Sequence, residues 1–284
     1  MSRSKRRGIA EETINIIQTG QYQKDNQIIS IKEEAEQSIK QSELFPMNHW
    51  NRGKWNALEF ILKEQSFNTK INVLNQTSLA ASHQLVESDG GGAKVLCLNF
   101  ASAKNPGGGF LGGSQAQEES LARSSSLYPT LTKFMPEMYE FHRRRKSCLY
   151  THTMIYSPAV PVFRDDSDEL LSEPYLLSFL TSPAVNAGAV NRNEPQNTAK
   201  IEATMLERIE RVLAISFEKG YKKLVLGAWG CGVFQNKPIE MANWFAQFLL
   251  KNGKYAQAFE DITFAVLDHS KDGKFISAFE DTFG

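Results

Sequence analysis

Short apolar runs alternate with longer amphipathic segments along most of the chain after residue 70. A short apolar run is typical of a buried strand, whereas apolar residues that recur every three or four positions are typical of a helix. The pattern predicts strand–helix pairs at 71–74 with 79–86, 95–100 with 117–127, 224–227 with 238–250, and 262–267 with 275–279. This alternation predicts an α/β fold, with helices on the faces of a sheet.

Further elements are expected between these pairs. Apolar runs predict strands at 154–162 and 175–180, and helical spacing predicts a long helix from about residue 199 to 218 that Gly220 ends. Asp89 and the glycines up to residue 92 predict a turn. The chain contains no internal repeat and no low-complexity linker, so no hinge between separate domains is predicted.

The first 70 residues follow a different pattern. Helical spacing predicts helices at 8–19, which ends at Gly20, and at 31–40. Because the strand–helix alternation begins only after them, we interpret residues 1–70 as an α-rich N-terminal accessory extension. Residues 71–284 then form the core, and the two parts are expected to pack as one unit.

Composition permits a sizeable hydrophobic core and narrows the choice of ligands. Of 284 residues, 41% are hydrophobic, and 32 basic residues balance 32 acidic ones. Without a net field, neither nucleic acid nor a membrane is favoured as a partner, and local dipoles would have to hold a negatively charged ligand. The basic clusters at 3–7 and 143–146 lack interleaved aromatic residues, so we interpret both as solvated surface.

The cysteines and histidines predict neither a disulfide framework nor a metal site. Cys97, Cys148 and Cys231 lie far apart, without a Cys-x-x-Cys pair, which favours reduced thiols. His152 and His269 lack metal-ligand spacing, so we expect no metal and no cofactor. The charged start precedes no apolar signal segment, and no run approaches the ~20 apolar residues of a membrane span. We therefore expect an intracellular, cytoplasmic protein.

Two glycine-rich loops are the most informative segments of the chain. Residues 105–114 follow the strand at 95–100, and residues 227–235 precede Pro238, which suits the first turn of a helix. Glycine lets the backbone approach a ligand and aim its N–H groups at it. Both loops follow the carboxyl ends of predicted strands, where open α/β sheets bind ligands, so we expect them to grip one anionic ligand such as a diphosphate. Neither loop matches the Walker A or the Rossmann glycine pattern, which disfavours nucleoside triphosphate hydrolysis and dinucleotide binding.

The spacing within the first loop resembles that of a known family. The glycines at 107–109, followed after seven residues by Gln-Glu-Glu at 117–119, are similar to the signature of the bacterial-type (microbial) poly(ADP-ribose) glycohydrolases. Supporting stretches lie at 7–13, 20–22, 99–101 and 227–234, so the resemblance extends over most of the chain. The resemblance implies a macrodomain-like mixed sheet flanked by helices, with the catalytic core at 71–284.

The same resemblance implies an activity and its partners. Members of this family are glycosidases that hydrolyse the ribose–ribose O-glycosidic bonds of poly(ADP-ribose), mainly from the exposed end of the chain, and release ADP-ribose. We expect an enzyme that needs no cofactor, and separately we expect it to be a monomer. Its expected partners are poly(ADP-ribose) or ADP-ribosylated macromolecules.

Glu118 and Glu119 are the candidate acids. Successive helix residues diverge by about 100°, so these two cannot flank a scissile bond as the carboxylates of an ordinary glycosidase do. A single carboxyl can protonate the leaving oxygen and then deprotonate water. The resemblance assigns this acid and base role to Glu119. It implies that Glu118 holds a ribose hydroxyl and that Gln117 orients the two glutamates. A helix N-terminus lowers a carboxyl pKa and burial beside a diphosphate raises it, and the sequence leaves open which effect prevails.

The remaining site residues also come from the resemblance. It places Asn105 on the hydroxyls of the terminal ribose and the backbone of Gly107, Gly108 and Gly109 beside that ribose. Around the diphosphate it places Gly230, Cys231, Gly232, Val233 and Phe234. Phe234 could equally be a core residue, and Cys231 has no nearby histidine to make it a nucleophile. The loop 268–275, with Phe275 for stacking, is a candidate adenine site.

Two other functions remain open at the level of sequence. A macrodomain that binds ADP-ribose without hydrolysing it would share the fold, and the two glutamates would then only complement the helix dipole. A hydrolase of mono-ADP-ribosylated protein or nucleic acid would share both the fold and the glutamate. Sequence motifs separate these poorly, because the bond attacked depends on how the pocket frames the leaving group.

Overall fold

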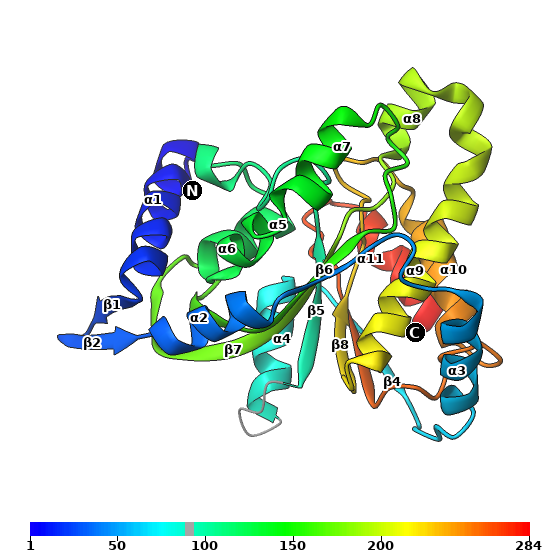
Figure 1. Ribbon diagram of the computed structural model, residues 1–284, viewed down its shortest axis with the longest axis horizontal. Coiled ribbons are helices and arrows are strands. Elements are labelled where there is room, and N and C mark those ends of the chain that lie inside the picture. Colours follow the sequence, from blue (N-terminus) through cyan, green and yellow to red (C-terminus); the bar gives the residue numbers. More distant parts are fainter. Residues whose placement is uncertain (89–93) are drawn as a thin grey trace.

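A seven-stranded mixed sheet forms the centre of the computed structural model, which describes residues 1–88 and 94–284 (Figure 1). The turn predicted at 89–92 lies outside the described residues. Across the sheet the strand order is β3-β6-β7-β5-β8-β9-β4. The strands are β3 (Glu43–Phe45), β4 (Lys70–Leu74), β5 (Val95–Phe100), β6 (Met154–Arg164), β7 (Leu170–Ser182), β8 (Lys223–Leu226) and β9 (Asp261–Ala265).

The sheet is parallel except at one edge. Strands β7, β5, β8, β9 and β4 run parallel to one another, whereas β6 pairs antiparallel with β7, and β3 pairs antiparallel with β6. Every strand predicted from the apolar runs is present, and the α/β prediction with a mixed sheet is confirmed. β5 lies between β7 and β8, so the loops after β5 and β8 leave the same edge of the sheet side by side.

Helices cover both faces, which explains why β5 is apolar from Val95 to Leu98. Val95 and Cys97 enter one hydrophobic cluster, and Leu96 and Leu98 enter the other. A parallel strand buried on both faces has no polar alternation. The first face carries α4 (Ser78–Ser88), α5 (Gln117–Ser124) and α6 (Leu127–Thr132); the second carries α3 (Arg52–Leu62), α9 (Ile201–Glu218), α10 (Pro238–Leu249) and α11 (Lys274–Phe283) (Figure 1).

The N-terminal residues contain more structure than their pattern predicted. Helix α1 (Arg3–Thr19) ends at Gly20 in the left-handed conformation and leads into a hairpin of β1 (Gln21–Lys24) and β2 (Gln27–Ser30). Helix α2 (Lys32–Gln41) then precedes β3, an edge strand of the main sheet. The hairpin, β3 and α3 were not predicted. Phe45 and Leu58 join the larger cluster, so both sides of residue 70 share a core, and a division there stays a prediction.

One helix is shorter than predicted. The segment 117–127 divides because Ser125 is extended, with φ −148° and ψ 173°, and forms a bridge to Val162. Strand contacts therefore override helical spacing at this residue. Short elements complete the fold: a π-helix at Met135–Glu140, α7 (Phe141–Arg144), α8 (Ala187–Asn193), and 3-10 turns at Phe110–Gly112 and Pro195–Lys200.

Candidate active site

Gln117 joins the start of α5 to the end of β5. Its Oε1 accepts from the backbone N–H of Phe100 at 2.8 Å, and its Nε2 donates to the carbonyl of Leu98 at 2.8 Å and to Ser78 Oγ at 3.1 Å. The side chain thus replaces strand hydrogen bonds that β5 would otherwise lose at its end. Gln117 orients the helix that carries both glutamates by holding it against the strand.

Glu118 is buried beneath the first glycine loop, with 3% of its surface exposed. Its carboxylate accepts from the backbone N–H of Ser102 at 2.6 Å and from Asn99 Nδ2 at 3.4 Å. Burial raises the pKa of Glu118 to about 8, and the charge of Glu119 adds to the shift, while the hydrogen bonds from Ser102 and Asn99 oppose it. At this carboxyl, burial prevails over the helix N-terminus, and the protonated form is favoured at neutral pH.

Glu119 is partly exposed and held by the loop it faces. Its Oε1 accepts from the backbone N–H of Gly109 at 2.9 Å. Gly108 has a φ of +61°, and a Cβ there would collide with the Glu119 carboxyl and lie 3.2 Å from Glu118 Oε2. The two side chains leave the helix in different directions, as expected, yet both carboxyl groups end beside Gly108.

The first glycine of the triplet serves packing. Gly107 has a φ of +68°, and a Cβ there would lie 2.8 Å from the ring of Phe110. Phe110 is fully buried and packs with Ala10 of α1 and Ala122 of α5. The close turn of the loop over the helix therefore depends on a missing side chain.

Helix α1 holds the far end of the same loop. Arg3 Nε donates to the carbonyl of Gly112 at 2.9 Å, and Arg6 Nε donates to the carbonyl of Gly113 at 2.8 Å. Thr13 Oγ1 donates to the carbonyl of Arg123 at the end of α5, at 2.6 Å. The N-terminal extension thus contacts both the loop and the helix of the site, which the sequence did not predict.

Asn105 lies exposed on the outer side of the loop. Arg143 donates through NH2 to Asn105 Oδ1 at 3.3 Å and through Nε to the carbonyl of Lys104 at 2.7 Å. Residues 143–146 were interpreted as solvated surface, and Arg143 was therefore missed as a neighbour of the site. No sequence signal connects it to Asn105, because 38 residues separate the two.

The second glycine loop presents backbone donors. Gly230 has a φ of +70°, and a Cβ there would lie 2.5 Å from Ala184 Cβ, so only glycine fits. Asn236 Nδ2 donates to the carbonyl of Gly230 at 3.0 Å and fixes the turn. Among the residues that the structure describes, the N–H groups at 232–234 donate to no protein acceptor. They are available to an anionic ligand.

Phe234 lies at the rim of this loop. The ring is partly exposed, packs against the larger cluster, and lies 6.1 Å from the ring of Tyr150, centroid to centroid. The carbonyl of Phe234 accepts from the N–H of Gly188 at 3.0 Å. The residue is therefore a border residue of the core, with one side free to contact a ligand. Val233 beside it is 82% exposed.

Cys231 provides no thiolate. The side chain is buried, its Sγ lies 3.8 Å from the carbonyl of Trp229, and burial raises the pKa of the thiol to about 12. A nucleophilic cysteine needs a lowered pKa. What this residue offers a ligand is its place in the backbone turn.

The loop after β9 reaches the second glycine loop. Asp268 accepts from the backbone N–H of Phe275 at 2.7 Å and of Ile276 at 3.2 Å, which fixes the start of α11. A cavity of about 320 Å³ lies between the two loops. Its lining includes Cys231, Gly232, Lys237, Lys274 and Phe275.

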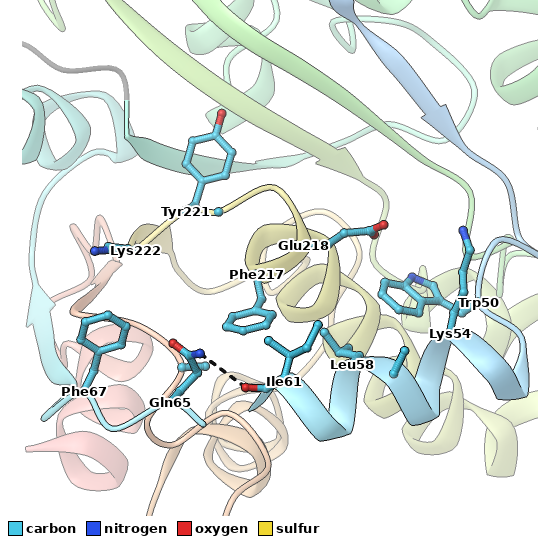
Figure 2. A pocket seen from close by; sticks show the side chains of 13 residues that line it. Trp50, Lys54, Leu58, Ile61, Gln65, Phe67, Phe217, Glu218, Tyr221 and Lys222 are labelled. Carbon is cyan, nitrogen blue, oxygen red and sulfur yellow. Dashed lines mark hydrogen bonds between the residues drawn. The ribbon is translucent and has the colours of Figure 1, made fainter. Parts of the chain in front are cut away.

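A second cavity, of about 440 Å³, lies at the other end of the sheet (Figure 2). Leu58 and Ile61 of α3 face Phe217 of α9 across it, and Tyr221 and Lys222 border it just before β8 begins. The glycine loops follow the carboxyl ends of β5 and β8, so this cavity is separate from the candidate site.

The part of the chain that the structure describes contains neither a metal-binding cluster nor a membrane-spanning helix. Within residues 1–88 and 94–284, no three His, Cys, Asp or Glu side chains are arranged to hold a metal ion. In the same described part of the chain, every helix is too short or too polar to cross a bilayer.

Comparison with known proteins shows the family. The protein-family model of the microbial-type poly(ADP-ribose) glycohydrolase catalytic domain matches residues 10–165 of this chain. The structure of poly(ADP-ribose) glycohydrolase from Thermomonospora curvata matches this one with a TM-score of 0.88 and 40% sequence identity. The match covers 99% of this chain and 100% of that chain. The same enzyme bound to the inhibitor ADP-HPD is 41% identical with a TM-score of 0.86, over 98% and 99% of the two chains.

A second relative is more distant in structure. Poly(ADP-ribose) glycohydrolase from Deinococcus radiodurans in complex with ADP-ribose is 40% identical with a TM-score of 0.78, over 87% of this chain and 96% of that one. Curated protein sequences gave no match. The likeness confirms the macrodomain-like fold and the family inferred from the glycine triplet and Gln-Glu-Glu. This chain therefore belongs to the microbial-type poly(ADP-ribose) glycohydrolases, and it is a glycosidase.

Proposed function

We propose that this chain cleaves the ribose–ribose bonds of poly(ADP-ribose) with Glu119 as the general acid and base. The observation that supports this assignment most directly is the hydrogen bond from the Gly109 N–H to Glu119 Oε1, which holds a partly exposed carboxyl against the glycine triplet. The loop is the surface on which the terminal ribose is expected to lie. Glu119 is thus the carboxyl of the pair that a leaving oxygen can reach.

The reaction proceeds in two proton transfers. Cleavage at the anomeric carbon passes through an oxocarbenium-like transition state, and Glu119 donates its proton to the departing oxygen of the preceding unit. The resulting carboxylate then removes a proton from water as the water attacks the anomeric carbon. The diphosphate of the bound substrate brings negative charge near the pair, which favours a protonated carboxyl before cleavage.

Glu118 holds the terminal ribose. Its carboxyl group is buried beside Gly108 and is kept in place by Ser102 and Asn99, so it presents a fixed oxygen to a ribose hydroxyl. Asn105, at the outer side of the loop, contacts the remaining hydroxyls. This pair of polar contacts orients the anomeric carbon toward Glu119.

The ligand of the two loops is an ADP-ribose unit. The solved relatives bind ADP-ribose and the inhibitor ADP-HPD, and the free N–H groups at 232–234 suit the diphosphate. The cavity bordered by Gly232 and Phe275 is large enough for a ring to enter, which supports the adenine site predicted after β9. The family resemblance supports cleavage mainly from the exposed end of the polymer.

Release of ADP-ribose from automodified, chain-bearing protein tests the assignment. The wild type should shorten chains, and Glu119→Gln should lose about 100-fold or more in turnover while retaining calorimetric binding of ADP-ribose. Glu202→Gln is the matched control, because Glu202 is an exposed acid in the first turn of α9. A wild type that binds ADP-ribose without shortening chains would instead mark a reader module, and oligomers among the early products would mark endo cleavage.

A further inference from the structure

Arg143 and Lys104 border the first glycine loop, and three further cationic residues follow Arg143 directly in the sequence. This basic rim consists of Lys104, Arg143, Arg144, Arg145 and Lys146. All four residues of 143–146 are exposed; Arg143 and Arg144 lie in the last turn of α7, and Arg145 and Lys146 follow it directly. In a chain of zero formal net charge, such a local concentration of one sign needs an explanation.

Arg143 is anchored to the loop rather than free in solvent. Its guanidinium donates to the Lys104 carbonyl at 2.7 Å and to Asn105 Oδ1 at 3.3 Å. Burial raises the pKa of the Cys148 thiol, and the Lys104 ammonium opposes that shift, which places Lys104 near the segment that follows the arginines. Arg143 and Lys104 therefore lie at the edge of the loop that carries Asn105, and the other three cations lie within three residues of Arg143 in the sequence.

The basic rim has no carboxylate partner in the described part of the chain. None of its five cations forms an ion pair with a carboxylate there. Other arginines do form such pairs, namely Arg123 with Asp168, Arg164 with Glu12, and Arg211 with Glu207. Unpaired cations that converge beside a ligand loop are suited to an anion from outside the protein.

Resting on the proposed function, we propose that the basic rim binds the diphosphate of the ADP-ribose unit that precedes the scissile bond. The leaving oxygen belongs to that unit, so its diphosphate must lie outside the loop once the terminal ribose contacts Asn105. The basic rim then favours the polymer, which is a polyanion, over ADP-ribose attached to an uncharged group. The diphosphate of the terminal unit has separate donors at 232–234.

The contribution of the basic rim can be measured by comparing two substrates that have the same terminal ADP-ribose unit and different leaving groups. One is poly(ADP-ribose), and the other is ADP-ribose with a 4-nitrophenoxy group at the anomeric carbon, whose leaving group contains no phosphate. Arg143→Gln and Lys104→Gln should each lower kcat/KM for the polymer about tenfold more than for the nitrophenyl substrate, mainly through KM. Each should also reduce the slope of log(kcat/KM) against log[salt] for the polymer by about 0.7 to 1.

Lys251→Gln is the control, because Lys251 is an exposed lysine after α10 at the opposite end of the sheet. Equal losses on both substrates would overturn the proposal and leave Arg143 as a support for Asn105, and an unchanged ratio of kcat/KM values would overturn it as well. Failure of the proposed function would give a different result: the wild type would hydrolyse neither substrate, or Glu119→Gln would remain active. Thermal unfolding of each variant confirms that the compared proteins are folded.

Discussion

The backbone N–H of Gly109 donates to Glu119 Oε1 across 2.9 Å, so the loop and the helix after it hold each other in place. Glu119 cannot rotate away without leaving that donor unsatisfied, and the loop cannot open without releasing the carboxyl. Residues ten positions apart in sequence thus form one preorganised unit.

Gly108→Ala is expected to disrupt this unit. A Cβ at Gly108 would collide with the Glu119 carboxyl, and the φ of +61° is unfavourable for alanine. We expect kcat to fall about 100-fold, because displacement of a catalytic group by an ångström has effects of that size. Gly8→Ala is the control: Gly8 lies within α1 with open space around it, so this variant should keep full activity and gain up to about 1 kcal/mol in stability. Near-normal kcat in Gly108→Ala would show that the loop adapts.

The raised pKa of Glu118 predicts a pH-dependent stability. Its pKa rises on folding from 4.5 to about 8, so the folded state binds the proton more tightly between these values. The free energy of unfolding should therefore fall as pH rises through this window, by up to about 1.4 kcal/mol per pH unit from this group.

Glu118→Gln removes the ionisation and keeps an acceptor for Ser102. Urea unfolding at pH 6 and pH 9 should show a smaller loss of stability in this variant than in the wild type. Equal losses in the two proteins would mean that Glu118 is ionised at little cost in the folded state. Glu87→Gln is a suitable comparison, because Glu87 is exposed on α4.

Arg6→Ala tests the contact between α1 and the glycine loop. The Arg6 side chain donates to the Gly113 carbonyl, so its loss should loosen the loop and lower kcat about three- to tenfold with little change in far-UV circular dichroism. Lys5→Ala is the control, since Lys5 is exposed one residue away. Equal kinetics in both variants would limit α1 to a structural role.

Asp268→Ala tests the loop after β9. Although burial opposes the shift, hydrogen bonds from Ser270, Phe275 and Ile276 lower the pKa of Asp268 to about 2. This contribution to stability is present above the unfolded pKa near 4 and is lost as pH falls toward 2. The variant should lose about 1–2 kcal/mol at pH 7 by denaturant unfolding, and much less than that near pH 2. Asp272→Ala, an exposed acid in the same loop, should lose little at either pH.

The local pattern of apolar and polar residues was sufficient to predict most strands and helices of the core. The run at Val95–Phe100 matches β5 in full, because a strand buried on both faces shows a continuous apolar stretch, here Val95 to Leu98, in place of polar alternation. Within 21–70 the helix predicted at 31–40 is present as α2, whereas β3 was not predicted, because it has only three residues and exists through its pairing with β6. The hairpin of β1 and β2 likewise lacks an apolar run of its own.

The sequence by itself determined the family signature and the succession of strands and helices along the chain in the core. It also determined that both glycine loops follow the ends of strands. The elements and the loops follow from local periodicity and from the conformations that only glycine permits, and the family signature is a resemblance of motifs. Only the tertiary structure decided that burial raises the pKa of Glu118, that α1 contacts the loop, and that Arg143 lies beside Asn105. Such properties depend on which distant segments exclude water from a residue or bring a charge to it, and sequence spacing contains no measure of either.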